Sequence, residues 1–76
     1  MIELVIKLEK LSDIRDFVKL ASQCPGDVVV HSQRWIVSGK SIMGMYSLEF
    51  SDELKVEIHG DIPAEVREGM KKFIAN

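Results

Sequence analysis

Two segments near opposite ends of the chain alternate apolar and polar side chains residue by residue, which is the pattern of half-buried β-strands. In the first, residues 2–8, one side carries Ile2, Leu4, Ile6 and Leu8. In the second, Leu54, Val56 and Ile58 alternate with Lys55, Glu57 and His59. A sheet with one apolar face needs a second layer to cover that face. The alternation therefore favours a sheet with helices packed on one side.

A β-hairpin is expected in the middle of the chain. Residues 27–32 contain three valines in a row, and such a β-branched run favours a strand. A short connection at residues 33–34 follows, and residues 35–37 (Trp-Ile-Val) return as the partner strand. These two strands and the two alternating segments give four strands in total.

Two longer segments have the spacing of amphipathic helices. The first begins at the N-cap pair Ser12-Asp13 and ends near Gln23, before Pro25-Gly26 turns the chain. Its predicted apolar stripe is Leu11, Ile14, Phe17, Val18 and Ala21. The second has Pro63 in its first turn, where a missing N–H costs little. Its predicted buried stripe is Val66, Met70, Phe73 and Ile74.

Residues 38–48 place a serine before large apolar residues that show no strand alternation, which predicts a short helix from about Ser41 to Leu48. The Ser41 hydroxyl is expected to accept a hydrogen bond from a backbone N–H of the first turn. A phosphate on it would lie against the positive end of the helix dipole. So short a helix cannot bury both Ile42 and Met43, and these two residues suit a docking patch for a protein.

The order of elements is β-α-β-β-α-β-α, without a linker, repeat or low-complexity segment. It predicts an α+β fold in which a four-stranded antiparallel sheet has three helices on one face. Residues 1–76 are expected to form a single domain. The uncovered face, which carries Val5, Val29 and Ile36, must meet water or a partner.

Composition excludes several classes of function. Charged residues make up 29% of the chain and the net charge is −2, without the basic patch that nucleic acid requires. No apolar run approaches the roughly 18–20 residues that span a bilayer, and the first residues do not resemble a signal peptide. We therefore expect a cytoplasmic protein that binds neither nucleic acid nor a membrane.

Four further residues are of types that often take part in chemistry or packing. His31 and His59 are expected on the solvated sheet face, without the spacing of a metal pair, so neither a metal nor another cofactor is expected. Cys24, the single cysteine, is expected to be a structural thiol with no basic neighbour to lower its pKa. Trp35 is expected at the edge of the core. No nucleophile–base pair has useful spacing, so the chain is not expected to be an enzyme.

Residues 40–48 (Lys-Ser-Ile-Met-Gly-Met-Tyr-Ser-Leu) resemble the regulatory-serine segment of HPr, the phosphocarrier of the bacterial sugar phosphotransferase system (PTS). Residues 17–22 (Phe-Val-Lys-Leu-Ala-Ser) are also similar to that family. The predicted element order matches the HPr order. The resemblance implies an HPr-like open-faced β-sandwich over the whole chain.

HPr carries the motif Gly-(Ile/Leu)-His-(Ala/Thr)-Arg-Pro at the start of its first long helix, and its histidine passes phosphate between PTS proteins. Aligned without gaps from Ser41, this motif falls on residues 8–13. Lys10 then occupies the histidine position, Ser12 the arginine position and Asp13 the proline position. A protonated lysine has no lone pair to accept a phosphoryl group. The resemblance therefore implies an HPr variant without the histidine carrier site.

Ser41 matches the serine that a dedicated kinase phosphorylates in HPr of low-GC Gram-positive bacteria. The catabolite-repression HPr-like proteins keep this serine without the histidine, and the chain is similar to them in type. The resemblance implies a non-catalytic regulatory protein whose partner is a serine kinase, a transcriptional regulator or a PTS component. The residues expected to contact that partner are Arg15, Lys40, Ile42, Met43 and Tyr46.

Three alternatives stay open from the sequence. In the first, Ser41 is only the N-cap of the short helix and is not a regulatory site. In the second, the chain is a phosphocarrier that uses another acceptor, such as His31. In the third, it is an interaction module of HPr fold without a PTS role, either a monomer or a weak homodimer built through the open sheet face.

Overall fold

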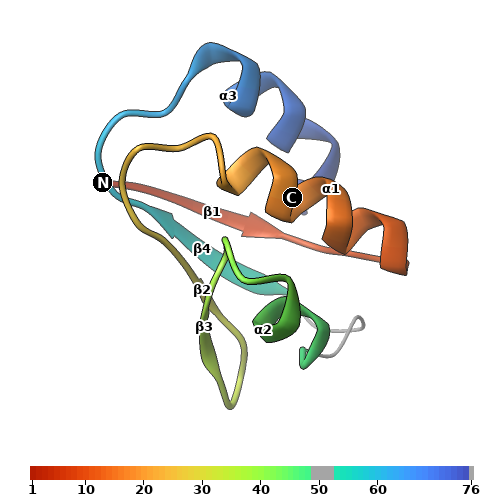
Figure 1. Ribbon diagram of the computed structural model, residues 1–76. Helices are drawn as coiled ribbons and strands as arrows, with labels where there is room; N and C mark the ends of the chain where they lie inside the picture. Colours follow the sequence, from red (N-terminus) through yellow and green to blue (C-terminus); the bar gives the residue numbers. More distant parts are fainter. Residues whose placement is uncertain (49–52, 76) are drawn as a thin grey trace.

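The computed structural model describes residues 1–48 and 53–75, and the predicted element order is confirmed within them (Figure 1). The strands are β1 (Ile2–Ile6), β2 (Val28–His31), β3 (Ile36–Ser38) and β4 (Leu54–Ile58). The α-helices are α1 (Leu11–Ala21), α2 (Ile42–Tyr46) and α3 (Ala64–Met70), and the 3-10 turn η1 (Lys71–Phe73) continues α3. The short helix expected from about Ser41 to Leu48 is shorter at both ends: Ser41 is its N-cap, and Ser47 and Leu48 follow the end of α2 at Tyr46.

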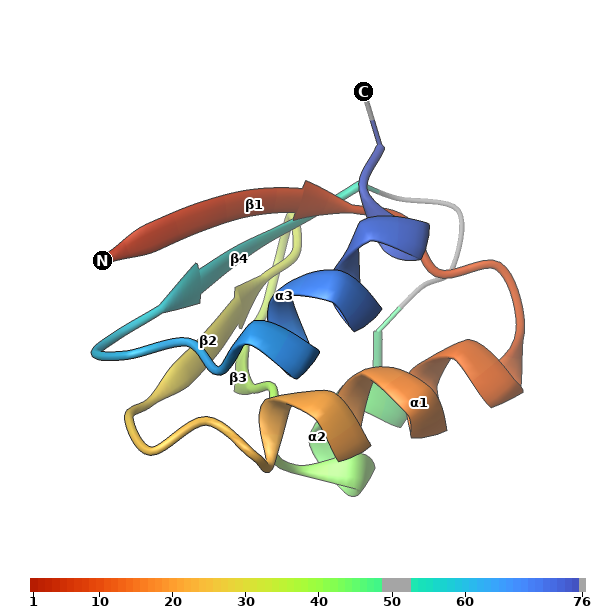
Figure 2. The same cartoon turned by 90° about the horizontal axis from the view of Figure 1, so that it is seen from above.

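The four strands form one sheet in the order β1-β4-β2-β3, and every neighbouring pair is antiparallel. Leu4 and Val30 both pair with Val56 from opposite sides, so these three side chains form one row across the sheet. Figure 2 shows all three helices on the same side of the sheet, as the alternation predicted. The opposite face of the sheet is left uncovered by helices.

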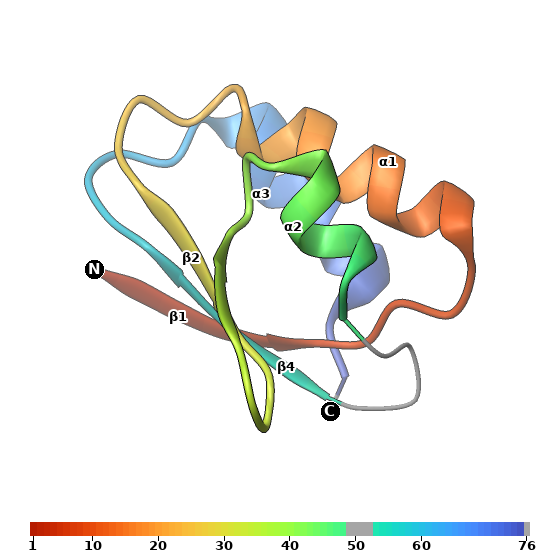
Figure 3. The same ribbon diagram turned by 60° about the horizontal axis from the view of Figure 1, so that its bottom comes forward.

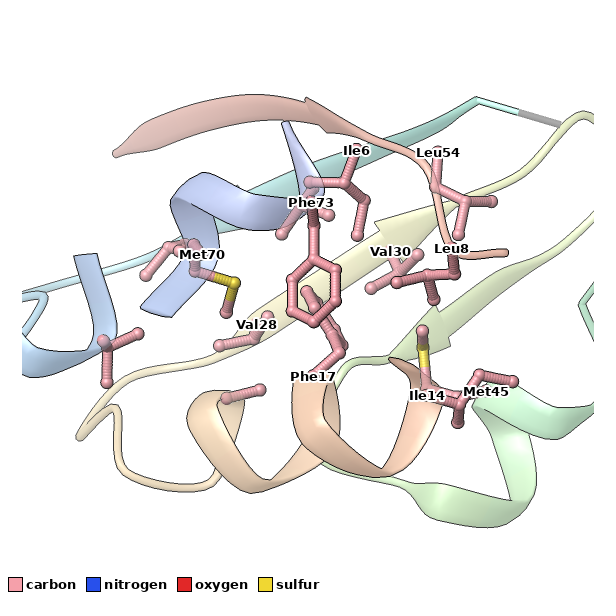
Figure 4. Packing of buried hydrophobic residues seen from close by; sticks show 14 of the residues in the cluster. Ile6, Leu8, Ile14, Phe17, Val28, Val30, Met45, Leu54, Met70 and Phe73 are labelled. Carbon is pink, nitrogen blue, oxygen red and sulfur yellow. The ribbon is translucent and has the colours of Figure 1, made fainter. Parts of the chain in front are cut away.

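The core lies between the sheet and the helices. Phe17 from α1 and Phe73 from η1 meet edge to face, with ring centroids 6.2 Å apart (Figure 4). Such pairs add about 0.5–1.5 kcal/mol beyond their area of burial. The other buried side chains are Ile6, Leu8, Ile14, Ala21, Cys24, Val28, Val30, Met45, Leu48, Leu54, Val56, Ile58, Val66 and Met70. These side chains come from three of the strands and from all three α-helices, and they form one cluster, so the described residues share one core.

Close contact between α1 and α3 depends on a glycine. A Cβ atom at Gly69 would lie 2.7 Å from Cδ2 of Leu20, a separation that real side chains essentially never adopt. Lys72 Nζ also reaches Asp16 Oδ2 at 3.2 Å across the two helices. The absence of a side chain at position 69 therefore lets α3 pack directly on α1.

The start of α1 differs from the prediction. The helix begins at Leu11 with Lys10 as its N-cap, two residues before the expected cap pair. The Asp13 carboxylate instead accepts a hydrogen bond of 3.0 Å from the Glu9 backbone N–H. Leu11 is exposed because, at 100° per residue, it lies at the flank of the arc that Ile14 and the later core residues occupy.

The end of the chain also differs from the prediction. Ile74 was expected in the buried stripe of the last helix, but it is exposed because the 3-10 turn ends at Phe73 and Ile74 is extended. It pairs with Ile6 at the outer edge of β1. The Lys7 N–H donates to the Phe73 carbonyl oxygen at 2.9 Å, and the Ala75 N–H donates to the Val5 carbonyl oxygen at 2.9 Å.

Trp35 was expected at the edge of the core, and this expectation was wrong. Its side chain is 61% exposed because it lies in the connection before β3, which begins at Ile36. The Ser32 Oγ accepts a hydrogen bond of 3.0 Å from the Trp35 backbone N–H, which closes the turn. The residue of β3 that packs against the core is Val37.

Candidate functional site

Ser41 is the N-cap of α2, as its position before an apolar run predicted. Its backbone is extended (φ −101°, ψ 110°), and its Oγ accepts a hydrogen bond of 3.0 Å from the Gly44 N–H. This bond satisfies one of the N–H groups that a helix leaves without a partner in its first turn. The serine side chain is half-buried, so the hydroxyl remains partly accessible to solvent.

Gly44 keeps the Ser41 hydroxyl close to the helix. A Cβ atom at this position would lie 3.3 Å from Ser41 Oγ and 3.3 Å from Cβ of Val37, which is tighter than most real contacts. Met45 is fully buried and anchors α2 to the core. Residues 41–45 (Ser-Ile-Met-Gly-Met) therefore contain both the N-cap, Ser41, and the buried side chain that fixes α2 to the core, Met45.

Three apolar side chains of α2 are exposed around this cap. The exposed fraction is 36% for Ile42, 78% for Met43 and 44% for Tyr46. Figure 3 shows α2 lying beside α1 on one side and the β2–β3 hairpin on the other. We call Ser41, Ile42, Met43 and Tyr46 the α2 surface. The expectation that so short a helix leaves Ile42 and Met43 accessible is confirmed.

Lys40 makes a contact that was not expected for a partner-binding residue. Its Nζ donates a hydrogen bond of 2.7 Å to the Cys24 carbonyl oxygen, and the lysine is half-buried. Cys24 is buried, and burial raises the pKa of its thiol while the Lys40 charge opposes the rise to a smaller extent. The structural role expected for Cys24 fits this burial, whereas the expectation that it has no basic neighbour was wrong.

Lys10 lies at the start of the first long helix, as the gap-free alignment with HPr requires. It is the N-cap of α1, its side chain is exposed, and it makes no side-chain capping bond. A shallow hollow beside it is lined by Lys7, Glu9, Lys10, Asp13, Lys72 and Phe73. The charges around this helix start are therefore mixed, and the side chain at the histidine position is a lysine.

The structure keeps Lys10 apart from Lys40 and the N-cap end of α2. Lys40, next to Ser41, reaches the chain just after the end of α1, whereas Lys10 caps the opposite end. The 11 residues of α1 put these ends about 16 Å apart along the helix axis. Arg15 is exposed on α1 and makes no ion pair within residues 1–48 and 53–75.

One cluster of side chains is not indicated by the sequence pattern alone. Glu57 lies between the two histidines on the open sheet face, with Oε2 3.1 Å from His31 Nε2 and Oε1 3.5 Å from His59 Nε2. His31 Nε2 is buried and makes no hydrogen bond among the described residues despite this distance. Alternation along residues 54–59 indicates that Glu57 and His59 share a face, but the register of β2 against β4 is needed to add His31. Within the described part of the chain, no group of three or more ligating side chains is arranged to hold a metal ion.

Comparison with known proteins identifies the family. A family model described as "PTS HPr component phosphorylation site" matches residues 13–76. The chain belongs to the HPr family. A crystal structure of HPr-C-His from Thermoanaerobacter tengcongensis superposes with a TM-score of 0.78 at 27% sequence identity, covering 97% of this chain and 91% of that one. The search of curated protein sequences gives no match.

Membership confirms the predicted fold and the broad class of function. HPr proteins are phosphocarriers of the PTS and not catalysts, and the expected open-faced β-sandwich matches the HPr structure. The family match begins at Asp13, so residues 8–12 precede it, although the alignment from Ser41 puts most of the histidine motif there. No helix among the described residues is long and apolar enough to cross a membrane.

Proposed function

We propose that this HPr-family chain is a regulatory protein that acts through contacts with other proteins and does not carry phosphate on a histidine. The observation that supports this most is the contact at Ser41, whose Oγ lies 3.0 Å from the Gly44 nitrogen beside exposed Ile42, Met43 and Tyr46. One modifiable hydroxyl therefore adjoins a compact apolar docking surface.

Phosphorylation of Ser41 would alter this surface without altering the fold. A phosphoserine carries about −1.5 to −2 charges near pH 7 and lies favourably at a helix start. The exposed apolar side chains of Ile42, Met43 and Tyr46 would gain a charged rim. A partner that recognises the unmodified apolar surface would lose affinity, and a partner with a basic pocket would gain it.

The residues at the start of α1 argue against the carrier chemistry of the family. Lys10 has no free lone pair when it is protonated, and the Asp13 carboxylate is held at the helix start by its bond to the Glu9 N–H. Both histidines are on the open sheet face beside Glu57. A phosphoryl group on either one would meet that carboxylate.

We infer that the partner is a serine kinase, a transcriptional regulator or another PTS protein. Arg15 and Lys40 contribute positive charge near the α2 surface in this proposal. Lys40 would first have to release the Cys24 carbonyl oxygen, since its Nζ is bonded there at 2.7 Å. Arg15 is exposed and needs no such rearrangement.

The decisive experiment treats the protein with an HPr serine kinase and ATP, and locates the phosphate by mass spectrometry. We expect one phosphate at Ser41, none in Ser41→Ala, and unchanged modification in Ser47→Ala, the matched control at the other end of α2.

A second experiment measures partner binding. Ser41→Asp and Met43→Ala should each change capture of a partner that has been identified with the wild type. Equal capture of the partner by the Ser41→Asp, Met43→Ala double variant and by the wild type would rule out the α2 surface as the binding site.

Two alternatives are separated by other measurements. Incubation with the general PTS phosphotransferase and phosphoenolpyruvate would leave an acid-labile phosphohistidine if the chain were a carrier with another acceptor. The third reading is an interaction module that dimerises through the open sheet face, where Val5 and Ile36 are exposed. Sedimentation of a dimer at micromolar concentration, together with no modification by the kinase, would favour that reading.

A further inference from the structure

A hollow of about 450 Å³ lies between β1 and α3, away from the α2 surface. Its apolar lining comes from Ile2, Leu4, Ile62, Met70 and Ile74. Figure 2 shows α3 running beneath the sheet on the side of β1. We call this hollow the β1–α3 groove.

The strip beside β1 is incompletely covered by α3. The helix lies close to α1 at Gly69, which faces Leu20. Ile2, Leu4 and Ile62 are accordingly only partly buried, although they pack against the core. Ile74, held beside Ile6 at the outer edge of β1, extends the apolar lining of the groove.

Two cationic side chains line the same groove. Arg67 and Lys71 are four residues apart, so they project from the same side of the helical segment. Lys71 Nζ pairs with Glu68 Oε1 at 3.0 Å, whereas Arg67 makes no ion pair among the described residues. No carboxylate is part of the described lining. The groove therefore combines apolar walls with a positive rim.

We propose that the β1–α3 groove binds an anionic amphiphile, namely an unbranched alkyl chain that ends in a carboxylate. The volume falls within the range of roughly 300–1,000 Å³ that is usual for small-molecule sites. The alkyl chain would lie on the apolar lining, and the carboxylate would accept paired hydrogen bonds from the Arg67 guanidinium. This activity is separate from the proposed function, because it uses β1 and α3 and none of the α2 surface.

The first test is a titration of ¹⁵N-labelled protein with octanoate, decanoate and 1-decanol below their aggregation concentrations. We expect chemical-shift changes at Ile2, Leu4 and Arg67. Decanoate should bind about fifteenfold more tightly than octanoate, because two more CH₂ groups are buried. Shift changes confined to Ile42, Met43 and Tyr46, or no change with any ligand, would overturn the proposal.

The second test separates the charge from the apolar walls. Arg67→Gln should weaken decanoate binding by about tenfold and leave 1-decanol binding unchanged. Arg34→Gln, at an exposed arginine in the β2–β3 connection, is the matched control and should alter neither ligand. Ile62→Ser should weaken both ligands. An equal loss of both ligands in Arg67→Gln, with a native ¹⁵N spectrum, would overturn the role of the charge and with it the proposal.

Discussion

The ammonium group of Lys40 donates a hydrogen bond of 2.7 Å to the backbone carbonyl oxygen of Cys24, which joins the approach to α2 to the chain just after α1. The carbonyl belongs to the turn that ends α1, and a cation there is also favourable for the helix dipole. Because Lys40 precedes Ser41, this bond holds the N-cap of α2 in position against α1. Lys40, which was expected to contact a partner, therefore has a structural role in the isolated chain.

Lys40→Met should destabilise the fold by about 1.5–3 kcal/mol, the usual range for a hydrogen bond from a charged group in partly buried surroundings. The methionine keeps much of the apolar stem but cannot donate to the Cys24 carbonyl oxygen. Urea unfolding measures the loss. Lys19→Met, at an exposed lysine of α1, is the control and should change stability little. Equal free energies of unfolding for the two variants would show that the Lys40 bond contributes nothing.

Cys24 should make stability depend on alkaline pH. Burial raises the pKa of its thiol above the ordinary value of 9.0, so the folded chain holds this proton more tightly than the unfolded chain. The resulting stabilisation is complete below pH 9 and is lost as the pH rises through the folded-state pKa. The destabilisation caused by Cys24→Ala should therefore shrink between about pH 8 and about pH 10.5.

Chemical unfolding of the wild type and Cys24→Ala at both pH values measures this change. Ser22→Ala, at a neighbouring exposed position, is the control and should show an effect that does not vary with pH. A Cys24→Ala effect that stays constant over the range would contradict the raised pKa.

Phe17→Ala and Phe73→Ala should each cost about 3–4 kcal/mol, because each leaves a cavity in a core of limited size. The rings contact one another with centroids 6.2 Å apart, so the two losses should not add, and a double-mutant cycle should reveal coupling. Tyr46→Ala removes an exposed aromatic ring and serves as the comparison. Wild-type melting of either phenylalanine variant would show that the packing has been misassigned.

Lys10→His alone should not create a phosphocarrier. The position begins α1, but the neighbouring Ser12 offers no cation, and the Asp13 carboxylate is held at the helix start by the Glu9 N–H at 3.0 Å. Incubation with the PTS phosphotransferase and phosphoenolpyruvate, with a histidine-containing HPr as the positive control, tests for acid-labile phosphate. Adding Ser12→Arg and Asp13→Asn should bring measurable transfer. Measurable transfer by the Lys10→His variant alone would contradict this prediction.

Local patterns were enough to predict the elements of this protein. The alternation of Leu54, Val56 and Ile58 specified β4 and its core face, because successive strand residues point to opposite sides. The cap at Ser41 was equally predictable, since its partner Gly44 is three residues away. The element order and the match of residues 40–48 to HPr then led to the fold and the family, both of which the comparisons confirm.

Contacts between distant residues were decided only by the tertiary structure. Lys40 meets a carbonyl oxygen 16 residues away, and the position of Glu57 beside His31 depends on the register of β2 against β4. The apolar lining of the β1–α3 groove likewise joins residues from both ends of the chain. Local periodicity states which face of an element is apolar, but the partner across that face depends on how all the elements pack together.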